Sequence, residues 1–274
     1  MEPTQLEDRN SQGPATTVGA RVDSAQDQKA AANAVREMFS SIAPRYDLLN
    51  HVLSASVDRL WWWQTARRFR AILADPDAAV LDICCGTGHM TRALLKGRPR
   101  GSRPILAADF AREMLSRGER RFKAREPASG APYAVALEAD ALHMPLRPAS
   151  LDLVVTAFGF RNLANYDAGL REFARVLKPC GELGILDFAE PGGWMGKLYG
   201  VYFHRILPAI GRLISGSTAN GQSAYSYLPA SVEKFPSPTE MLDRMLAAGY
   251  TDCQWRPYTF GIAGLYTGVR THAA

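Results

Sequence analysis

The sequence has little of what defines several protein classes. Its four cysteines include the adjacent pair Cys84-Cys85 and form no Cys-x-x-Cys, which fits neither a disulfide framework nor a zinc site, so we expect no bound metal. It contains no apolar run of about 18 residues and no basic-then-apolar leader. We therefore expect a cytoplasmic protein with no segment that spans a membrane.

What is present is typical of a globular protein. Of 274 residues, 47% are hydrophobic and 22% are charged, which is enough apolar material for a sizeable core. Residues 1–31 are polar and lack hydrophobic periodicity, so we expect a disordered tail. The remainder predicts a single domain over 32–270, followed by a tail at 271–274.

Positive charge is concentrated in one stretch. The net charge is +5, and residues 92–125 carry eleven Lys or Arg against Asp109, Glu113 and Glu119. Such a stretch forms a solvated helix face, contacts an anionic membrane or binds nucleic acid. No base-stacking or zinc-finger pattern accompanies it, so we expect no nucleic-acid partner, and a nucleic-acid-binding protein is kept as the alternative of another class.

Short apolar strands alternate with helices of about ten residues. After a first strand that Asp82 closes, strands are expected at 105–108, 133–137, 151–157 and 182–188, with helices at 112–123 and 168–177. This alternation predicts a doubly wound α/β domain with a mainly parallel sheet. Strands at 251–256 and 261–269 are expected to pair as a carboxyl-terminal antiparallel hairpin.

Three further segments surround this sheet. An amino-terminal helical cap is expected over 32–74, and we interpret its Trp61-Trp62-Trp63 as packing on the domain. The sequence Ser237-Pro238-Thr239-Glu240 predicts a helix with a capping box. The aromatic insertion at 192–230 has a basic rim. It covers a substrate site and faces the membrane, makes a partner interface, or forms a core helix pair.

The most informative motif follows the first strand. Asp82 closes that strand before Gly86 and Gly88, and Thr91 stands where a dinucleotide-binding loop has its third glycine, which argues against NAD or FAD. Asp109 and Asp140 follow the next two strands. Because ligands bind at the carboxyl ends of parallel strands, these three acids are spaced to hold an adenosine.

Several motifs resemble those of class I S-adenosylmethionine-dependent methyltransferases, which have a Rossmann-like, seven-stranded sheet. They are Asp82-x-Cys-Cys-Gly86-Thr87-Gly88, Ala108-Asp109-Phe110, Ala139-Asp140-Ala141-Leu142 and Arg175-Val176-Leu177-Lys178-Pro179. Other segments resemble the quinone-biosynthesis C-methyltransferases that act on demethylmenaquinone and on the ubiquinone precursor: residues 39–50, 157–163, 207–211 and 225–231. The sequence departs from that family pattern at His89, Cys180 and Tyr266.

The resemblance implies an enzyme that methylates the ring of a prenylated quinol, with S-adenosylmethionine as donor and S-adenosylhomocysteine as product. Another small lipophilic acceptor is the alternative. Thr87, Asp109, Asp140 and Ala141 take the family's cofactor positions. Asp82, Gly86 and Gly88 shape the loop at the donor's amino-acid end, and Ala157 borders the methyl group. Catalytic positions correspond to Arg161, Asn162 and Tyr46.

Ring methylation requires a phenolate whose neighbouring carbon attacks the sulfonium methyl group. Because arginine stays protonated, Arg161 is expected to stabilise the phenolate, while Tyr46 or water relays the proton and Asn162 orients it. The alternative for Arg161 is a salt bridge to a nearby acid, and His143 and His204 are alternative bases. A peripheral membrane contact is expected through the insertion, and a homodimer is left open.

Overall fold

The structure is a computed structural model that describes residues 19, 57–122, 130–189, 231–232 and 234–271. The expected tails at 1–31 and 271–274 therefore lie almost entirely outside the described residues. The cap up to residue 56, with Tyr46, and the whole of the 192–230 insertion, with His204, also lie outside the described residues.

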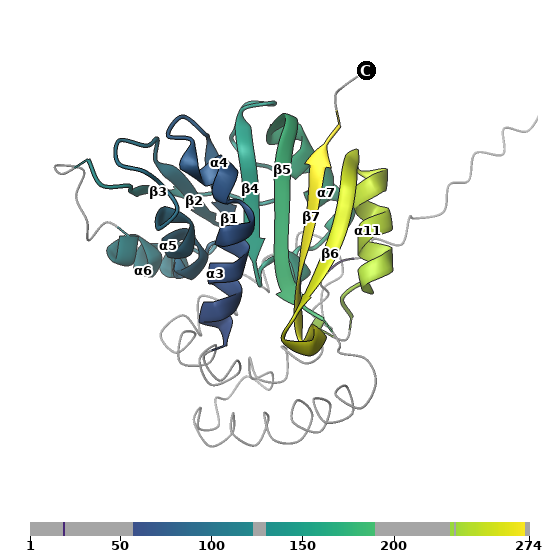
Figure 1. Cartoon of the computed structure of the whole chain (residues 1–274). Coiled ribbons are helices and arrows are strands. Elements are labelled where there is room, and N and C mark those ends of the chain that lie inside the picture. The colour runs from purple at the N-terminus through teal and green to yellow at the C-terminus, as the bar shows by residue number, and fades with distance from the viewer. Residues whose placement is uncertain (1–18, 20–56, 123–129, 190–230, 233, 272–274) are drawn as a thin grey trace, which may run out of the picture.

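The described residues form a seven-stranded sheet in the order β3-β2-β1-β4-β5-β7-β6 (Figure 1). Neighbours from β3 to β5 are parallel, whereas β7 runs antiparallel to both β5 and β6. This confirms the predicted doubly wound, mainly parallel sheet with a carboxyl-terminal hairpin. The strands are β1 (Val80–Ile83), β2 (Ile105–Asp109), β3 (Ala134–Glu138), β4 (Leu151–Ala157), β5 (Leu177–Phe188), β6 (Tyr250–Tyr258) and β7 (Ala263–Arg270).

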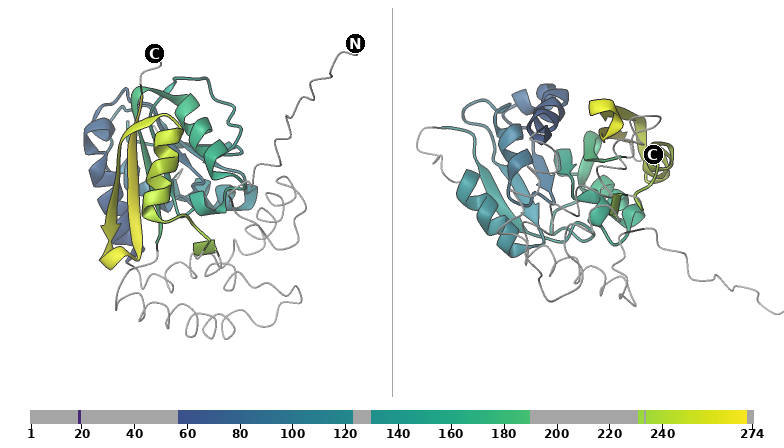
Figure 2. Two further views of the ribbon diagram at one scale, coloured as in Figure 1. Left: turned by 90° about the vertical axis from the view of Figure 1, so that its right-hand side faces the viewer. Right: turned by 90° about the horizontal axis from the view of Figure 1, so that it is seen from below.

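Helices cover both faces of the sheet, as the views in Figure 2 show. Buried residues of α3 (Asp58–Arg68), α4 (Arg70–Ala74), α5 (His89–Leu95) and α6 (Arg112–Phe122) share one hydrophobic core with Val80. Those of α7 (Tyr166–Val176) and α11 (Pro238–Ala247) share another with Leu81. Successive strand side chains point to opposite faces, so β1 is buried on both faces; its residues are apolar except for Asp82, which is a buried acid.

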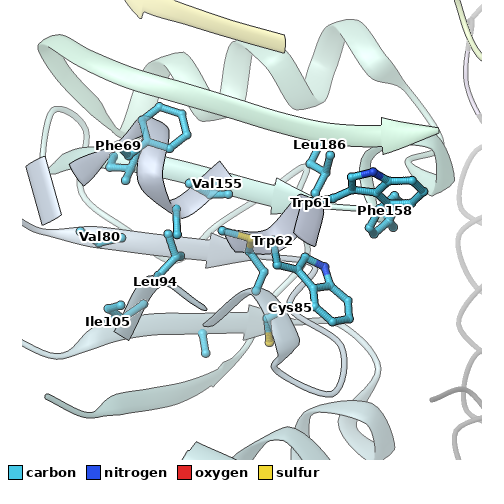
Figure 3. Packing of buried hydrophobic residues seen from close by; sticks show 14 of the residues in the cluster. Trp61, Trp62, Phe69, Val80, Cys85, Leu94, Ile105, Val155, Phe158 and Leu186 are labelled. Carbon is cyan, nitrogen blue, oxygen red and sulfur yellow. The ribbon is translucent and has the colours of Figure 1, made fainter. Parts of the chain in front are cut away.

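The tryptophans of α3 have different environments. Trp61 and Trp62 are only 2% and 7% exposed, and Figure 3 shows them packed near Phe158 and Cys85. The Trp61 indole N–H also donates to Thr259 Oγ1 at 2.8 Å, in the short turn η4 (Thr259–Gly261). The packing interpretation is confirmed for these two, whereas Trp63 is half exposed.

Several boundaries differ from the prediction for local reasons. The helix expected at 168–177 begins at Tyr166, because the Asn165 side chain caps it by accepting from the Ala168 N–H at 2.9 Å. β5 begins at Leu177 instead of residue 182, since Leu177 already pairs with Leu151. The predicted capping box of Ser237 and Glu240 is confirmed.

Candidate active site

The turn between β1 and α5 is built from left-handed backbone. Gly86 has φ +53° and Gly88 has φ +79°, and Cys84, which is not a glycine, has φ +57°. A Cβ on Gly88 would lie 2.9 Å from the Phe122 ring, so side-chain packing as well as backbone conformation requires glycine there. Strain of this kind persists where the surroundings hold a segment in place, often at ligand sites.

Asp109, at the end of β2, stabilises this turn by hydrogen bonding to its backbone. Its carboxylate accepts the Gly86 N–H at 2.7 Å and the Ala111 N–H at 2.8 Å. The side chain is almost fully buried, and burial raises its pKa to about 6 despite these hydrogen bonds. Each carboxylate oxygen has two lone pairs, so Asp109 keeps capacity to accept from a ligand hydroxyl.

Asp82, at the end of β1, is fully buried and only partly satisfied. Its Oδ2 accepts the Thr91 hydroxyl at 2.5 Å, whereas its Oδ1 has no hydrogen-bond partner among the described residues. Burial, the largest effect, raises the pKa of Asp82 to about 7. A buried acceptor without a donor is costly, so this oxygen is suited to receive a donor from a bound molecule.

A small cavity of about 30 Å³ joins these groups at the strand ends. Asp82, Gly86, Thr87 and Ala157 line it, together with Trp62 and other neighbours. The structure thus brings four of the sequence-predicted cofactor residues to one cavity, and Asp109 is hydrogen-bonded to one of them. A cavity of this volume is too small for a whole nucleotide.

Asp140 lies beyond the end of β3 at the same edge. Its Oδ1 accepts the Leu142 N–H at 2.9 Å, and its Oδ2 lies 3.6 Å from His143 Nδ1. The side chain is 56% exposed, whereas Ala141 is buried. The Ala139 N–H donates to the Asp109 carbonyl at 3.1 Å. This bond places the Asp140 loop next to the end of β2.

Arg161 and Asn162 lie in the turn η2 (Phe160–Asn162), just after β4. Arg161 Nη1 donates to Asp187 Oδ1 at 2.7 Å and to the Phe158 carbonyl at 2.6 Å. Asn162 Nδ2 donates to the same carbonyl at 3.4 Å. The salt bridge that was the alternative role of Arg161 is therefore present. It holds the Arg161 and Asp187 side chains together beside the ends of β4 and β5.

Three residues of this site were not anticipated from sequence. Asp187 is an acid near the end of β5, and the rule that selected Asp82 and Asp109 would have found it too. A Cβ on Gly118 of α6 would lie 2.9 Å from the Gly86 carbonyl oxygen, and one on Gly159 would lie 2.3 Å from Cys84 Cβ. The sequence signals that could have identified them are a glycine inside a predicted helix, for Gly118, and a glycine just after a predicted strand, for Gly159.

The fold and the turn with its acids define the class of protein. Over 86% of this chain and 99% of the other, the structure resembles a SAM-dependent methyltransferase from Thermotoga maritima, with a TM-score of 0.58 and 16% identity. That identity supports the fold alone. No group of three or more metal-ligating side chains occurs among the described residues. The architecture is that of the class I methyltransferases.

The particular family follows from sequence. The model of the ubiE/COQ5 methyltransferase family matches residues 24–270, so the chain belongs to this family and is a methyltransferase. It is 42% identical to the demethylmenaquinone methyltransferase of Deinococcus radiodurans, over 88% of this chain and 95% of that protein. It is also 43% identical to the enzyme of that name from Thermus thermophilus, over 85% and 100%.

The name of a third relative includes both pathways. The chain is 40% identical to the ubiquinone/menaquinone biosynthesis C-methyltransferase UbiE of Geobacter sulfurreducens, over 86% of this chain and 88% of that protein. The resemblance drawn from the motifs is thereby confirmed.

Proposed function

We propose that this enzyme transfers the methyl group of S-adenosylmethionine to a ring carbon of a prenylated quinol, as the names of its relatives indicate. The observation that carries the proposal is the cavity lined by Asp82, Gly86, Thr87 and Ala157, in a chain of this family. The acceptor is demethylmenaquinol or the equivalent ubiquinone precursor.

The proposed orientation of the donor follows from the groups at the strand ends. Its amino-acid end would enter the cavity, where the ammonium group can donate to the unpartnered Oδ1 of Asp82. The ribose hydroxyls would donate to Asp109, whose lone pairs are only partly used. Asp140, exposed at the end of β3, would accept the adenine amino group beside Ala141. Gly86 and Gly88 allow close backbone approach.

The methyl group would then lie near Ala157, with the quinol beyond it. As its hydroxyl loses a proton, the acceptor ring becomes a phenolate, and attack by the ring carbon releases S-adenosylhomocysteine. Arg161 would stabilise the oxyanion by its charge. A guanidinium held against a carboxylate, as Arg161 is against Asp187, stays protonated and is a poor base. The proton would therefore pass to Tyr46 or water, with Asn162 orienting it.

A long isoprenoid tail requires contact with lipid. None of the helices in the described part of the chain is both long and apolar enough to cross a bilayer. We place the enzyme at the cytoplasmic face of the membrane as a peripheral protein, with the 192–230 insertion toward the tail. The tail contact and a homodimer are proposals that rest on residues outside those described.

Calorimetric titration with S-adenosylhomocysteine tests the cofactor site. Asp109→Ala removes the acceptor of the Gly86 N–H, so we expect at least tenfold weaker binding, and Asp167→Ala, an acid on the opposite face of the sheet, is the control. Equal affinity of wild type and Asp109→Ala would contradict the assignment. Salt-dependent binding to nucleic acid, with no heat on adding the cofactor, would instead favour the nucleic-acid alternative.

The acceptor is tested separately with labelled donor and a panel of substrates. We expect transfer to short-chain demethylmenaquinol or to the ubiquinone precursor, and no transfer to sterols or simple phenols. Transfer to another lipophilic acceptor alone would keep the cofactor site and overturn the substrate.

A further inference from the structure

A second and larger cavity lies outside the cofactor site, in the groove between α3 and α5. Its volume is about 370 Å³, and Figure 1 shows the two helices side by side on one face of the sheet. Positive charge dominates its walls. Arg59 and Arg67 come from α3, Arg70 is the first residue of α4, and Arg92 and Lys96 come from α5 and its end.

This charge is not compensated locally. No Asp or Glu lines the groove, and none of the five cations makes an ion pair with an acid in the part of the chain that the structure describes. Arg68, which does not line the groove, does make one, with Glu182 at 3.2 Å. Five converging cations without a carboxylate are suited to an anion carrying more than one charged oxygen, such as a phosphate ester.

Large apolar side chains are exposed beside the groove. Leu60 and Trp63 of α3 are 47% and 50% exposed, and Phe260 of η4 is 78% exposed. The hydrogen bond from Trp61 to Thr259 ties η4 to α3, so these side chains belong to one side of the molecule. The Arg67 guanidinium lies 5.2 Å from the centre of the Trp63 ring. Exposed tryptophan next to arginine is typical of a membrane interface.

The groove adjoins the cofactor cavity. Trp62 and His89 line both cavities, and their rings stack with centroids 4.6 Å apart and an angle of 8° between the planes. A headgroup bound in the groove would therefore hold the strand ends, where the acceptor must enter, close to the lipid surface.

We propose that the groove between α3 and α5 binds the phosphate of an anionic phospholipid headgroup, with Leu60, Trp63 and Phe260 contacting the bilayer surface. The physiological use of this contact rests on the proposed function, because it brings the enzyme to a substrate that is dissolved in the membrane. The exposed apolar side chains favour a lipid surface over a soluble phosphate, which has no apolar part, and over duplex DNA, whose bases are already stacked on one another.

The test is sedimentation of the full chain with vesicles of phosphatidylcholine alone or mixed with phosphatidylglycerol. The groove variant is Arg67→Gln/Arg70→Gln/Lys96→Gln. The control is Arg147→Gln/Arg171→Gln/Arg256→Gln, which removes the same charge from exposed sites that do not line the groove. A surface cation contributes about fivefold to binding of anionic lipid, so we expect about 100-fold weaker binding for the groove variant and much less change for the control.

A second measurement changes no charge. Binding to vesicles should shift tryptophan fluorescence to the blue, and Trp63→Phe should lose most of that shift while it still sediments with the vesicles. An unchanged shift in Trp63→Phe would contradict the proposed orientation.

Competition and DNA-binding measurements distinguish a lipid headgroup from free phosphate and from nucleic acid. The proposal requires that 10 mM inorganic phosphate or glycerol phosphate compete weakly and that duplex DNA bind no better to wild type than to the groove variant. Equal sedimentation of the groove variant and the control, or a groove-dependent affinity for DNA or free phosphate alone, would overturn it. No quinol is present in these assays, so their failure leaves the methyl-transfer proposal intact. Failure of the methyl-transfer assay would likewise leave the binding of vesicles unaffected.

Discussion

Arg161 and Asp187 form a buried ion pair that joins the ends of two neighbouring strands. The Nη1 to Oδ1 distance is 2.7 Å, and the two side chains are 4% and 0% exposed. Asp187 also accepts the backbone N–H of Arg161 at 3.1 Å, and the guanidinium lies 5.2 Å from the centre of the Phe188 ring. Asp187 is therefore a positioning residue for Arg161 and the η2 turn.

Removing this acid should destabilise the protein strongly. Asp187→Ala leaves the Arg161 charge buried without its partner, and we expect a loss of about 3–5 kcal/mol in the free energy of unfolding by urea. Asp167→Ala is the matched control, because its pair with Arg244 is partly exposed and should contribute no more than about 1 kcal/mol. Equal losses in the two variants would contradict the structural role of the buried pair.

The pH dependence of cofactor affinity should follow Asp109. Its carboxylate form accepts ribose hydroxyls, and its pKa is about 6. The affinity for S-adenosylhomocysteine should therefore rise as pH increases from 5 to 7, by up to about tenfold per pH unit below the pKa. Calorimetry on Asp109→Asn should give a flatter profile. An equally steep profile in that variant would assign the titration to another group.

Asp82 should make the stability of the folded protein depend on pH. Its pKa is raised from 3.8 to about 7 in the folded protein, so the folded state binds more protons than the unfolded state between these values. Stability from this group is greatest below about pH 4 and decreases as pH rises toward 7, by on the order of 2–4 kcal/mol. Urea unfolding at pH 5 and pH 7.5 should show a smaller decrease for Asp82→Asn than for wild type.

Gly118 should be required for the shape of the cofactor loop. In Gly118→Ala the new Cβ would lie 2.9 Å from the Gly86 carbonyl oxygen, and backbone cannot move aside as a side chain does. We expect S-adenosylhomocysteine to bind at least tenfold more weakly, because overpacking of this kind costs about 1–3 kcal/mol. Gly169→Ala, also in a helix but against the Leu163 side chain, should bind the cofactor as wild type does.

Much of the fold could be predicted because its signals are local. The apolar run Leu151–Ala157 predicts β4, and the predicted bounds 151–157 match the structure. The start of β5 could not be predicted. Lys178 and Pro179 suggest a turn, and it is pairing with β4 that extends the strand to Leu177. Cys180, where the sequence departs from the family pattern, has φ +62°, a left-handed conformation that favours glycine.

The positions of the candidate site residues at strand ends could be predicted from the sequence, whereas their hydrogen-bond and ion-pair partners could not. Asp82, Asp109 and Asp140 follow from their positions after strands. Nothing in the sequence states that Asp109 would accept the Gly86 N–H or that Arg161 would pair with Asp187, 26 residues away. These contacts arise from packing between strands that are adjacent in space but distant in sequence.

The central claim is carbon methylation of a prenylated quinol, and the position of the transferred methyl group tests it most directly. The enzyme is incubated with S-adenosylmethionine labelled with ¹³C in the methyl group and a short-chain demethylmenaquinol kept reduced, and the product is examined by NMR. A labelled methyl group bonded to a ring carbon is the predicted result. Label bonded to oxygen, or no transfer by an enzyme that binds S-adenosylhomocysteine, would contradict the account.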